Sequence, residues 1–200
     1  MSASRDDTLY QALGDQQRNN GAGQWLFAGR TGGGDIRRGL IAFDIAAGLP
    51  AGATVKTVTL TLTVSRTVAG DAEVGLHRVR TDWQEGTGDA PNNEGQGIEA
   101  VQGDVTWTQR VFGSQDWGNP GGDFAGGASA VVTVQGEAAY TWESTSQLVA
   151  DVQSWLDDPA ANFGWLVLGD ESKAQTTKRF NSSENEDQAT RPELMVVYSQ

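Results

Sequence analysis

Hydrophobic and polar residues alternate along much of the chain, and this is the period of a β-strand with one buried face. The clearest example is residues 57–64, where Val58, Leu60, Leu62 and Val64 alternate with four threonines. β-branched residues favour strands, so this segment predicts a strand with one dry face and one wet face. The dry face requires a second layer, which the rest of the chain must supply.

A partner strand is predicted immediately before it, at Leu40–Ile45. Here Ile41, Phe43 and Ile45 alternate with a small and an acidic residue. The segment Leu49-Pro50-Ala51-Gly52 follows, with a fixed φ at the proline and a permissive backbone at the glycine, and it suits a turn. The two strands and the turn form the centre of the predicted fold.

The same reasoning predicts further strands, separated by polar segments that include a turn at Asp15–Asn20 and a long loop at Gly169–Arg191. The strands are Ser4–Leu13, Trp25–Gly29 (ending at Arg30), Glu73–Trp83 with a bulge where Val79 falls out of phase, Val105–Trp107, Ser129–Val134, Ala139–Trp142, Phe163–Leu168 and Glu193–Tyr198.

One helix is predicted, at Ser144–Leu156. Its apolar residues recur at helical spacing and are Leu148, Val149, Val152, Trp155 and Leu156. Ser144 or Thr145 can cap its start, and Asp158-Pro159 ends it. The pattern therefore predicts an all-β, jelly-roll-like β-sandwich with one short α-helix, and we expect residues 1–200 to form a single domain, since neither a repeat nor a linker is visible.

Composition and charge narrow the possible partners. The net charge is −12, so the field of the protein repels nucleic acid and anionic membranes, and no apolar run is long enough to insert into a bilayer. The acidity suits calcium, extracellular surroundings and neutral ligands, or it serves solubility alone. There is no cysteine, so thiolate metal sites are excluded. The first residues lack the apolar segment of a signal peptide.

Residues 84–127 form a long irregular stretch rich in glycine, asparagine and aspartate, and loops of this length are usually functional or disordered. Within it Trp117 lies beside Asp116, Asn119, Asp123 and Phe124. A tryptophan can stack on the apolar face of a pyranose while neighbouring polar groups bind its hydroxyls. We therefore predict a sugar-binding site at these five residues. The alternative is that Trp117 anchors the loop.

Other tryptophans are expected in the core (Trp155 and Trp165) or at strand ends, in packing roles (Trp83 and Trp107). His77, the only histidine, is expected to be an ordinary strand residue, because no nucleophile motif accompanies it. A pair of carboxylates for glycoside hydrolysis could come from Asp82, Glu85, Asp89 or Asp123, but chance pairing is expected among 26 acidic residues. No catalysis is predicted.

Oxygen ligands for a structural calcium occur at two places. Asn181, Ser183, Asn185 and Asp187 alternate in one polar loop, although Glu186 and Pro192 break the EF-hand pattern there. Asp6, Asp7 and Asp15 form the second group. A solvated acidic turn is the alternative for both.

Several blocks of the sequence resemble, in order, those of one family. They are SRDDTLYQ (4–11), NGAGQWLFAGR (20–30), RRGLIAFDI and LPAGATVKTVTLTLTVSR (within 37–66), HRVRTDWQEG (77–86), GDVTWTQR (103–110), WGNPGGDF (117–124), STSQLVADVQSWLDDPAANFGWLVLGDE (144–171) and RPELMVVY (191–198). Together they resemble the bacterial DNRLRE-type β-sandwich domains, which are related to carbohydrate-binding module family 96.

The resemblance covers essentially the whole chain and implies a jelly-roll-like sandwich, export to the cell surface or beyond, and polysaccharide binding without catalysis. Asp7 departs from the family, which often carries asparagine there. An acidic glycan such as alginate would be repelled unless Arg30, Arg37, Arg38 and Arg179 gather locally. The alternative function is a structural building block of an extracellular fibre or shell that contacts identical copies, and a polysaccharide hydrolase or lyase ranks third.

Overall fold

The computed structural model describes residues 1–11, 17–68 and 70–200, and it confirms the all-β sandwich with a short helix. Its strands are β1 (Arg5–Tyr10), β2 (Arg18–Asn19), β3 (Trp25–Arg30), β4 (Ile36–Ala42), β5 (Thr54–Thr67), β6 (Ala72–Arg78), β7 (Ile98–Glu99), β8 (Gln109–Val111), β9 (Gln115–Asp116), β10 (Ala130–Val134), β11 (Ala139–Trp142), β12 (Trp165–Leu168), β13 (Lys178–Asn181) and β14 (Glu193–Ser199). Its helices are α1 (Ile45–Gly48) and α2 (Ser146–Asp157), with 3-10 turns at Pro159–Ala161 and Gln188–Thr190.

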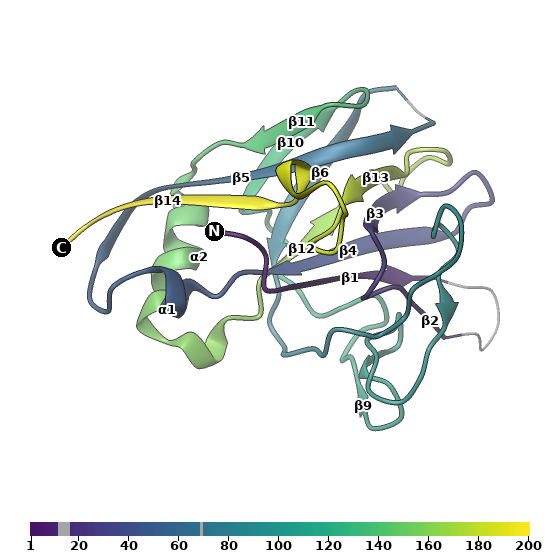
Figure 1. The fold of residues 1–200 in the computed structure, drawn as a ribbon, viewed down its shortest axis with the longest axis horizontal. Coiled ribbons are helices and arrows are strands. Elements are labelled where there is room, and N and C mark those ends of the chain that lie inside the picture. The colour runs from purple at the N-terminus through teal and green to yellow at the C-terminus, as the bar shows by residue number, and fades with distance from the viewer. Residues whose placement is uncertain (12–16, 69) are drawn as a thin grey trace.

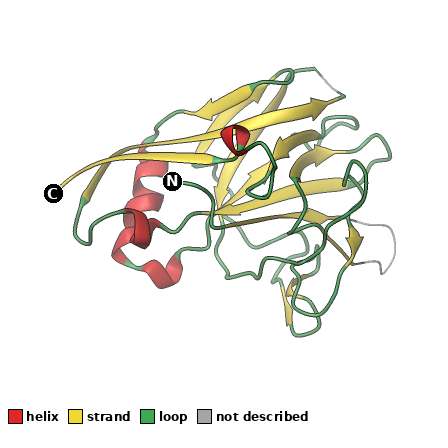
Figure 2. Cartoon of the chain, in the orientation of Figure 1, coloured by secondary structure: helices red, strands yellow, loops and turns green. Residues whose placement is uncertain are grey.

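One antiparallel sheet curls over to form both layers of the sandwich (Figures 1 and 2). Its strand order is β10-β6-β12-β4-β3-β13-β5-β11, with β1 added to β4 and β14 added to β5. The long strand β5 pairs with β14 at its start and with β11 and β13 further on, so it belongs to one layer and turns into the other. Two small two-stranded sheets, β2-β7 and β8-β9, lie outside this path.

The alternation in β5 is confirmed. Val58, Leu60, Leu62 and Val64 are at most 1% exposed and belong to the main core, while the threonines between them face outward. The core also contains Ile41, Phe43, Trp155 and Trp165, as the sequence predicts.

A second hydrophobic cluster lies on the opposite face of β4 and β12. Leu40 and Leu166 contribute from the strands, Trp83 contributes from the residues that follow β6, and Val105 and Trp117 contribute from residues 84–127, which cover them. Strands β4 and β12 are thus buried on both faces. The prediction that β4 has one solvent-exposed face is wrong for Ala42, which is 3% exposed. Ala42 is buried because residues 84–127 fold back over the sheet.

The helix is confirmed with a start two residues later than predicted. The Thr145 hydroxyl caps it by accepting the N–H of Leu148 at 3.0 Å, and Asp158 follows its last turn. Asp151 fastens the helix to the sheets, since its buried carboxylate accepts hydrogen bonds from Ser129 Oγ at 2.5 Å and Trp165 Nε1 at 2.9 Å. None of the helices in the described residues is long and apolar enough to cross a membrane.

Several boundaries differ from the prediction. Strand β4 ends at Ala42, and Ile45 begins the one-turn helix α1, because the Asp44 side chain accepts the N–H of Ala47 at 3.0 Å. Strand β6 ends at Arg78, so Val79 marks the end of a strand and not a bulge. The predicted first strand ends at Tyr10, and residues 12–16, including Leu13 and Asp15, lie outside the described residues.

The predictions of a strand at Val105–Trp107 and of a continuous loop at Gly169–Arg191 are wrong. Val105–Trp107 forms no strand, because its carbonyls bind side chains: Val105 O accepts Asn19 Nδ2 at 3.0 Å, and Thr106 O accepts Trp117 Nε1 at 2.9 Å. The loop Gly169–Arg191 contains strand β13 between β3 and β5. Its Lys178 is buried because the ammonium donates to Thr67 Oγ1, Gly70 O and Gln135 O at 2.7–3.0 Å.

Candidate functional site: a groove on the outer face of one sheet

An open groove of about 610 Å³ lies on the outer face of β10, β6 and β12. Its floor is low because Gly75 of β6 stands in register between Val131 of β10 and Leu168 of β12. Val74 and Leu76 face the core, so Gly75 faces outward, and the missing side chain makes room for the ring of His77, whose Nε2 lies 2.9 Å from the position that a Cβ of Gly75 would take. Glu73 and His77 stand at either side of Gly75 along the same face of β6.

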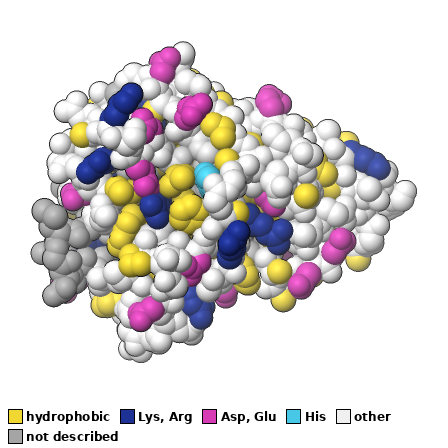
Figure 3. Space-filling model, turned by 180° about the vertical axis from the view of Figure 1, so that it is seen from behind, with side chains coloured by type: hydrophobic (Ala, Val, Ile, Leu, Met, Phe, Trp, Pro, Cys, Tyr) yellow, Lys and Arg dark blue, Asp and Glu magenta, His cyan; other side chains and the backbone are white. Residues whose placement is uncertain are grey.

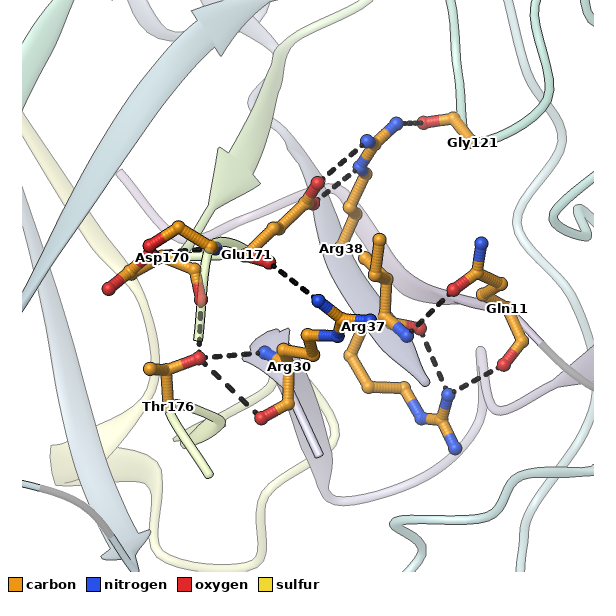
Figure 4. Close-up of polar contacts among 10 residues, drawn as sticks. Gln11, Arg30, Arg37, Arg38, Gly121, Asp170, Glu171 and Thr176 are labelled. Atoms are coloured by element: carbon orange, nitrogen blue, oxygen red, sulfur yellow. Dashed lines mark hydrogen bonds and ion pairs between the residues drawn. The ribbon is translucent and has the colours of Figure 1, made fainter. Parts of the chain in front are cut away.

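One wall of the groove is the loop that follows β12, with Asp170 and Glu171. Arg38 of β4 holds this loop: its Nε and Nη2 donate to the two carboxylate oxygens of Glu171 at 2.7 and 2.9 Å (Figure 4). The third guanidinium nitrogen of Arg38 donates to Gly121 O at 2.8 Å, so the arginine also reaches the long covering segment.

A second set of contacts holds the base of the wall. The N–H of Arg30 donates to the Thr176 hydroxyl at 2.9 Å, and that hydroxyl donates to the carbonyl of Asp170 (Figure 4). Ser172 donates to the Asp170 carboxylate from its N–H at 2.9 Å and from its hydroxyl at 2.6 Å. These hydrogen bonds lower the pKa of Asp170, which keeps this exposed group ionised.

Two aromatic rings lie against residues that form or support the groove, namely His77 and Arg38. Phe124 meets the ring of His77 edge-on at 5.6 Å, and the guanidinium of Arg38 lies 5.3 Å from the Phe124 ring centre and 4.8 Å from that of Trp107. Both rings are partly exposed. Figure 3 shows this face, where hydrophobic side chains gather with arginine, acidic and histidine side chains around them.

His77 is a hydrogen-bonded strand residue, as predicted. Its Nδ1 lies 2.9 Å from the carbonyl oxygen of Ala125, and the side chain is part of the groove floor. The sequence pattern alone does not connect His77 with Gly75, Val131 and Leu168. The available signal was a glycine inside a strand pattern, which often marks a close approach or a hollow.

The predicted sugar platform at Trp117 is wrong. The ring is 5% exposed, packs in the second hydrophobic cluster and donates through Nε1 to Thr106 O at 2.9 Å. Trp117 therefore anchors the long loop, which was the alternative. Trp83 also packs as expected, and it donates to Phe163 O at 2.9 Å.

The four residues predicted to accompany Trp117 do not form one site. Asp123 closes a turn by accepting the N–H groups of Gly118 and Asn119 at 2.7 and 2.9 Å. Asp116 accepts from Gln109 Nε2 at 2.6 Å. Phe124 lies against His77, as described above.

The predicted calcium ligands are partly brought together. Asp6 is 2% exposed, and its carboxylate accepts the N–H of Ser183 at 2.7 Å, so the first strand meets the polar loop. Glu85 accepts the N–H of Asp6 at 2.6 Å. Burial, with the charges of Glu184 and then Glu85, raises the pKa of Asp6 well above its ordinary value, and burial raises the pKa of Glu85 to about 7.

Asp7 lies in a separate cradle. Its two oxygens accept hydrogen bonds from Thr8 N, Asn20 N, Asn19 Nδ2 and Gly86 N at 2.6–3.3 Å. Burial still raises the pKa of Asp7 to about 7 against these donors. The cradle ties β1 to β2 and to the start of the long covering segment.

The remaining predicted calcium ligands make hydrogen bonds within the polar loop. Asn181 donates to Thr190 Oγ1 at 2.6 Å, Asn185 Oδ1 accepts the N–H of Asp187 at 3.0 Å, and Asp187 caps a 3-10 turn through Ala189 N at 3.1 Å. In the part of the chain that the structure describes, three or more acidic or histidine side chains do not converge as metal ligands. Calcium binding stays a prediction.

The other charged candidates are engaged separately. Asp82 pairs with Arg5 at 2.9 Å, while Glu85 and Asp123 make the contacts given above. Of the four arginines, Arg37 is buried and donates to the backbone of Gln11 and Ile36, and Arg179 lies 3.9 Å from the ring centre of Trp25. The arginines therefore do not combine into a cationic patch at the groove, since Arg38 is neutralised by Glu171.

Comparison of the chain with protein-family models and with curated protein sequences finds no match. The fold defines a class: an all-β sandwich with a curled antiparallel sheet and a short helix. Its candidate site is the groove across the outer face of β10, β6 and β12.

Proposed function

We propose that the chain is a non-catalytic, polysaccharide-binding module of a secreted or cell-surface protein. The observation that carries the proposal is the open groove across β10, β6 and β12, which has Val131, Leu168 and the His77 ring over Gly75 at its floor and polar groups at its walls. A sugar ring has apolar C–H faces and a polar edge, so it suits a groove with an apolar floor and hydrogen-bonding walls. The resemblance to DNRLRE-type domains agrees with this proposal.

A second candidate is a building block of an extracellular assembly, favoured by strand β14. Met195 and Val197 are 59% and 52% exposed on its outer face, and Tyr198 is 39% exposed beside them. β14 pairs with β5 over its length, and it lies outside the path of strands through the sheet. Exposed apolar residues on such a strand are suited to contact with an identical copy.

One pair of variants separates the two candidates. Val131 in the groove and Val197 on β14 are both valines in strands, at 53% and 52% exposure. Val131→Arg should abolish binding on a glycan array without changing the oligomeric state. Val197→Arg should leave binding intact. Equal binding by both variants and the parent protein would refute a site in this groove.

The assembly candidate makes the opposite prediction. If copies associate through β14, sedimentation velocity should show association in the parent protein and its loss in Val197→Arg. A monomeric parent protein at high concentration would count against that candidate.

A further inference from the structure

The polar lining of the groove consists mainly of hydrogen-bond acceptors. Four carboxylates line it, from Asp71, Glu73, Asp170 and Glu171, while lysine and arginine are absent from its lining in the described part of the chain. Glu73 is exposed and makes no hydrogen bond to other described residues. An ionised carboxylate only accepts hydrogen bonds, so the acceptor positions that Arg38 and Ser172 leave open suit a ligand that donates.

His77 adds a ring nitrogen to the polar groups at the floor. The carbonyl of Ala125 can only accept, so the hydrogen bond of 2.9 Å between them places the proton on Nδ1. Nε2 of the neutral ring then carries a lone pair. His77 is 8% exposed, and among the described residues Nε2 has no hydrogen-bond partner.

The position of Nε2 follows from Gly75. A Cβ atom added to Gly75 would lie 2.9 Å from Nε2 and 3.2 Å from Cδ2 of the ring. The ring therefore occupies the space over Gly75, and its unused acceptor lies at the floor of the groove in which the proposed ligand would sit. A side chain at position 75 would displace the ring.

We propose that the groove selects sugars that are neutral or carry an amine, that their O–H or N–H groups donate to Nε2 of His77 and to the wall carboxylates, and that uronic acids are rejected. This inference rests on the proposed function, because it names the ligand class of the same groove. A uronate would bring a negative charge beside the carboxylates of Asp71, Glu73 and Asp170, and Arg38, which lies next to the lining, is already paired with Glu171.

The ligand class is tested with a glycan array that carries hexasaccharides in matched sets. Each set has one linkage and three forms: glucose, glucosamine and glucuronic acid. We expect binding of the first two forms, with the glucuronic acid form at least about tenfold weaker in calorimetry. Equal or tighter binding of the glucuronic acid form, abolished by Val131→Arg, would overturn this inference and leave the proposed function standing. The absence of binding to any form would instead refute the proposed function.

Two substitutions test the role of His77, because one can replace the hydrogen bond of Nδ1 and the other can replace the acceptor at Nε2. His77→Asn can keep the hydrogen bond to Ala125 O but removes the acceptor at Nε2, and it should weaken binding about five- to tenfold. His77→Gln can place an amide oxygen near Nε2, and it should recover much of the affinity. If His77 only holds the segment around Ala125 in place, the order of the two affinities reverses, and His77→Asn should bind the glycan more tightly than His77→Gln.

Glu73→Gln tests whether the carboxylates of the groove wall determine the preference for neutral sugars. It removes one negative charge from an exposed residue, so it should narrow the preference for the neutral over the glucuronic acid hexamer about two- to fivefold. Glu143→Gln, an exposed residue outside the lining, is the matched control and should not change the preference. An unchanged ratio in Glu73→Gln would show that the wall carboxylates do not determine specificity.

Discussion

Arg38 and Glu171 are joined by two parallel hydrogen bonds of 2.7 and 2.9 Å, although 133 residues separate them in the chain. The pair is only partly exposed, at 14% and 22% of the two side chains. It connects the centre of the sheet to the loop that forms one wall of the groove. Two parallel bonds fix an orientation that a single contact leaves free.

Arg38→Lys should therefore weaken glycan binding about three- to tenfold, because lysine keeps the charge but not the planar fork that orients Glu171. We expect a smaller loss of stability, about 1–2 kcal/mol, from the lost contact with Gly121 O. Calorimetry and denaturant unfolding measure the two effects. Arg80→Lys, at an exposed position, is the control. Unchanged affinity in Arg38→Lys would show that the wall does not depend on the fork.

Leu60 and Thr61 test the two faces of β5. Leu60 is fully buried in the main core, so Leu60→Ala should reduce the free energy of unfolding by about 2–5 kcal/mol. Thr61 faces outward and contacts Thr141 Oγ1 at 3.0 Å, and Thr61→Ala should cost about 1 kcal/mol or less. Denaturant midpoints compare the two, and similar losses would contradict the assignment of faces.

Trp117→Ala should lower stability by about 3–5 kcal/mol, because it removes a buried ring from the second hydrophobic cluster and its hydrogen bond to Thr106 O. Asn119→Ala changes an exposed residue of the same loop and is the control. Thermal unfolding in the absence of ligand measures both. A melting temperature unaffected by Trp117→Ala would show that the ring does not anchor the loop.

Stability should fall as the pH rises from about 5 to 8. Burial raises the pKa of Asp7 to about 7 and that of Glu85 to about 7, above the values near 4 expected in the unfolded chain. Between these values the folded state binds more protons, so the free energy of unfolding decreases with pH until both groups are ionised. For Asp7, which is 1% exposed, the decrease should be on the order of 2–4 kcal/mol.

Glu85→Gln isolates one part of this effect. Glutamine can still accept the N–H of Asp6 but cannot ionise, so the variant should gain stability at pH 8 and show a shallower pH dependence. Glu143→Gln should retain the parent profile. Denaturant unfolding at pH 5, 6, 7 and 8 gives the profiles, and stability that increases with pH in the parent protein would contradict the assignment.

Local pattern was sufficient for the main strand and the helix. The period of two in β5 and the period of 3.6 in α2 each reflect one buried face, and both are visible in the residues themselves. Thr145 and Asp158 could also be identified as helix ends, because capping uses side chains close in sequence.

Tertiary structure decided the rest. Strand β13 has charged residues at Lys178 and Arg179, and it is stable inside the sheet only because distant oxygens and the ring of Trp25 receive these side chains. The residues next to Trp117 in the sequence do not determine whether its side chain points outward or inward. It is buried because the long segment folds back onto β4 and β12, whose second faces are also hydrophobic.

The groove shows the same division. The sequence supplies a glycine at position 75 and a histidine two residues later on the same side of a strand. The floor of the groove exists because Val131 and Leu168, each more than 50 residues away along the chain, stand in register on either side of Gly75. Strand register depends on backbone hydrogen bonds between segments far apart in sequence, so it is determined only when the sheet forms.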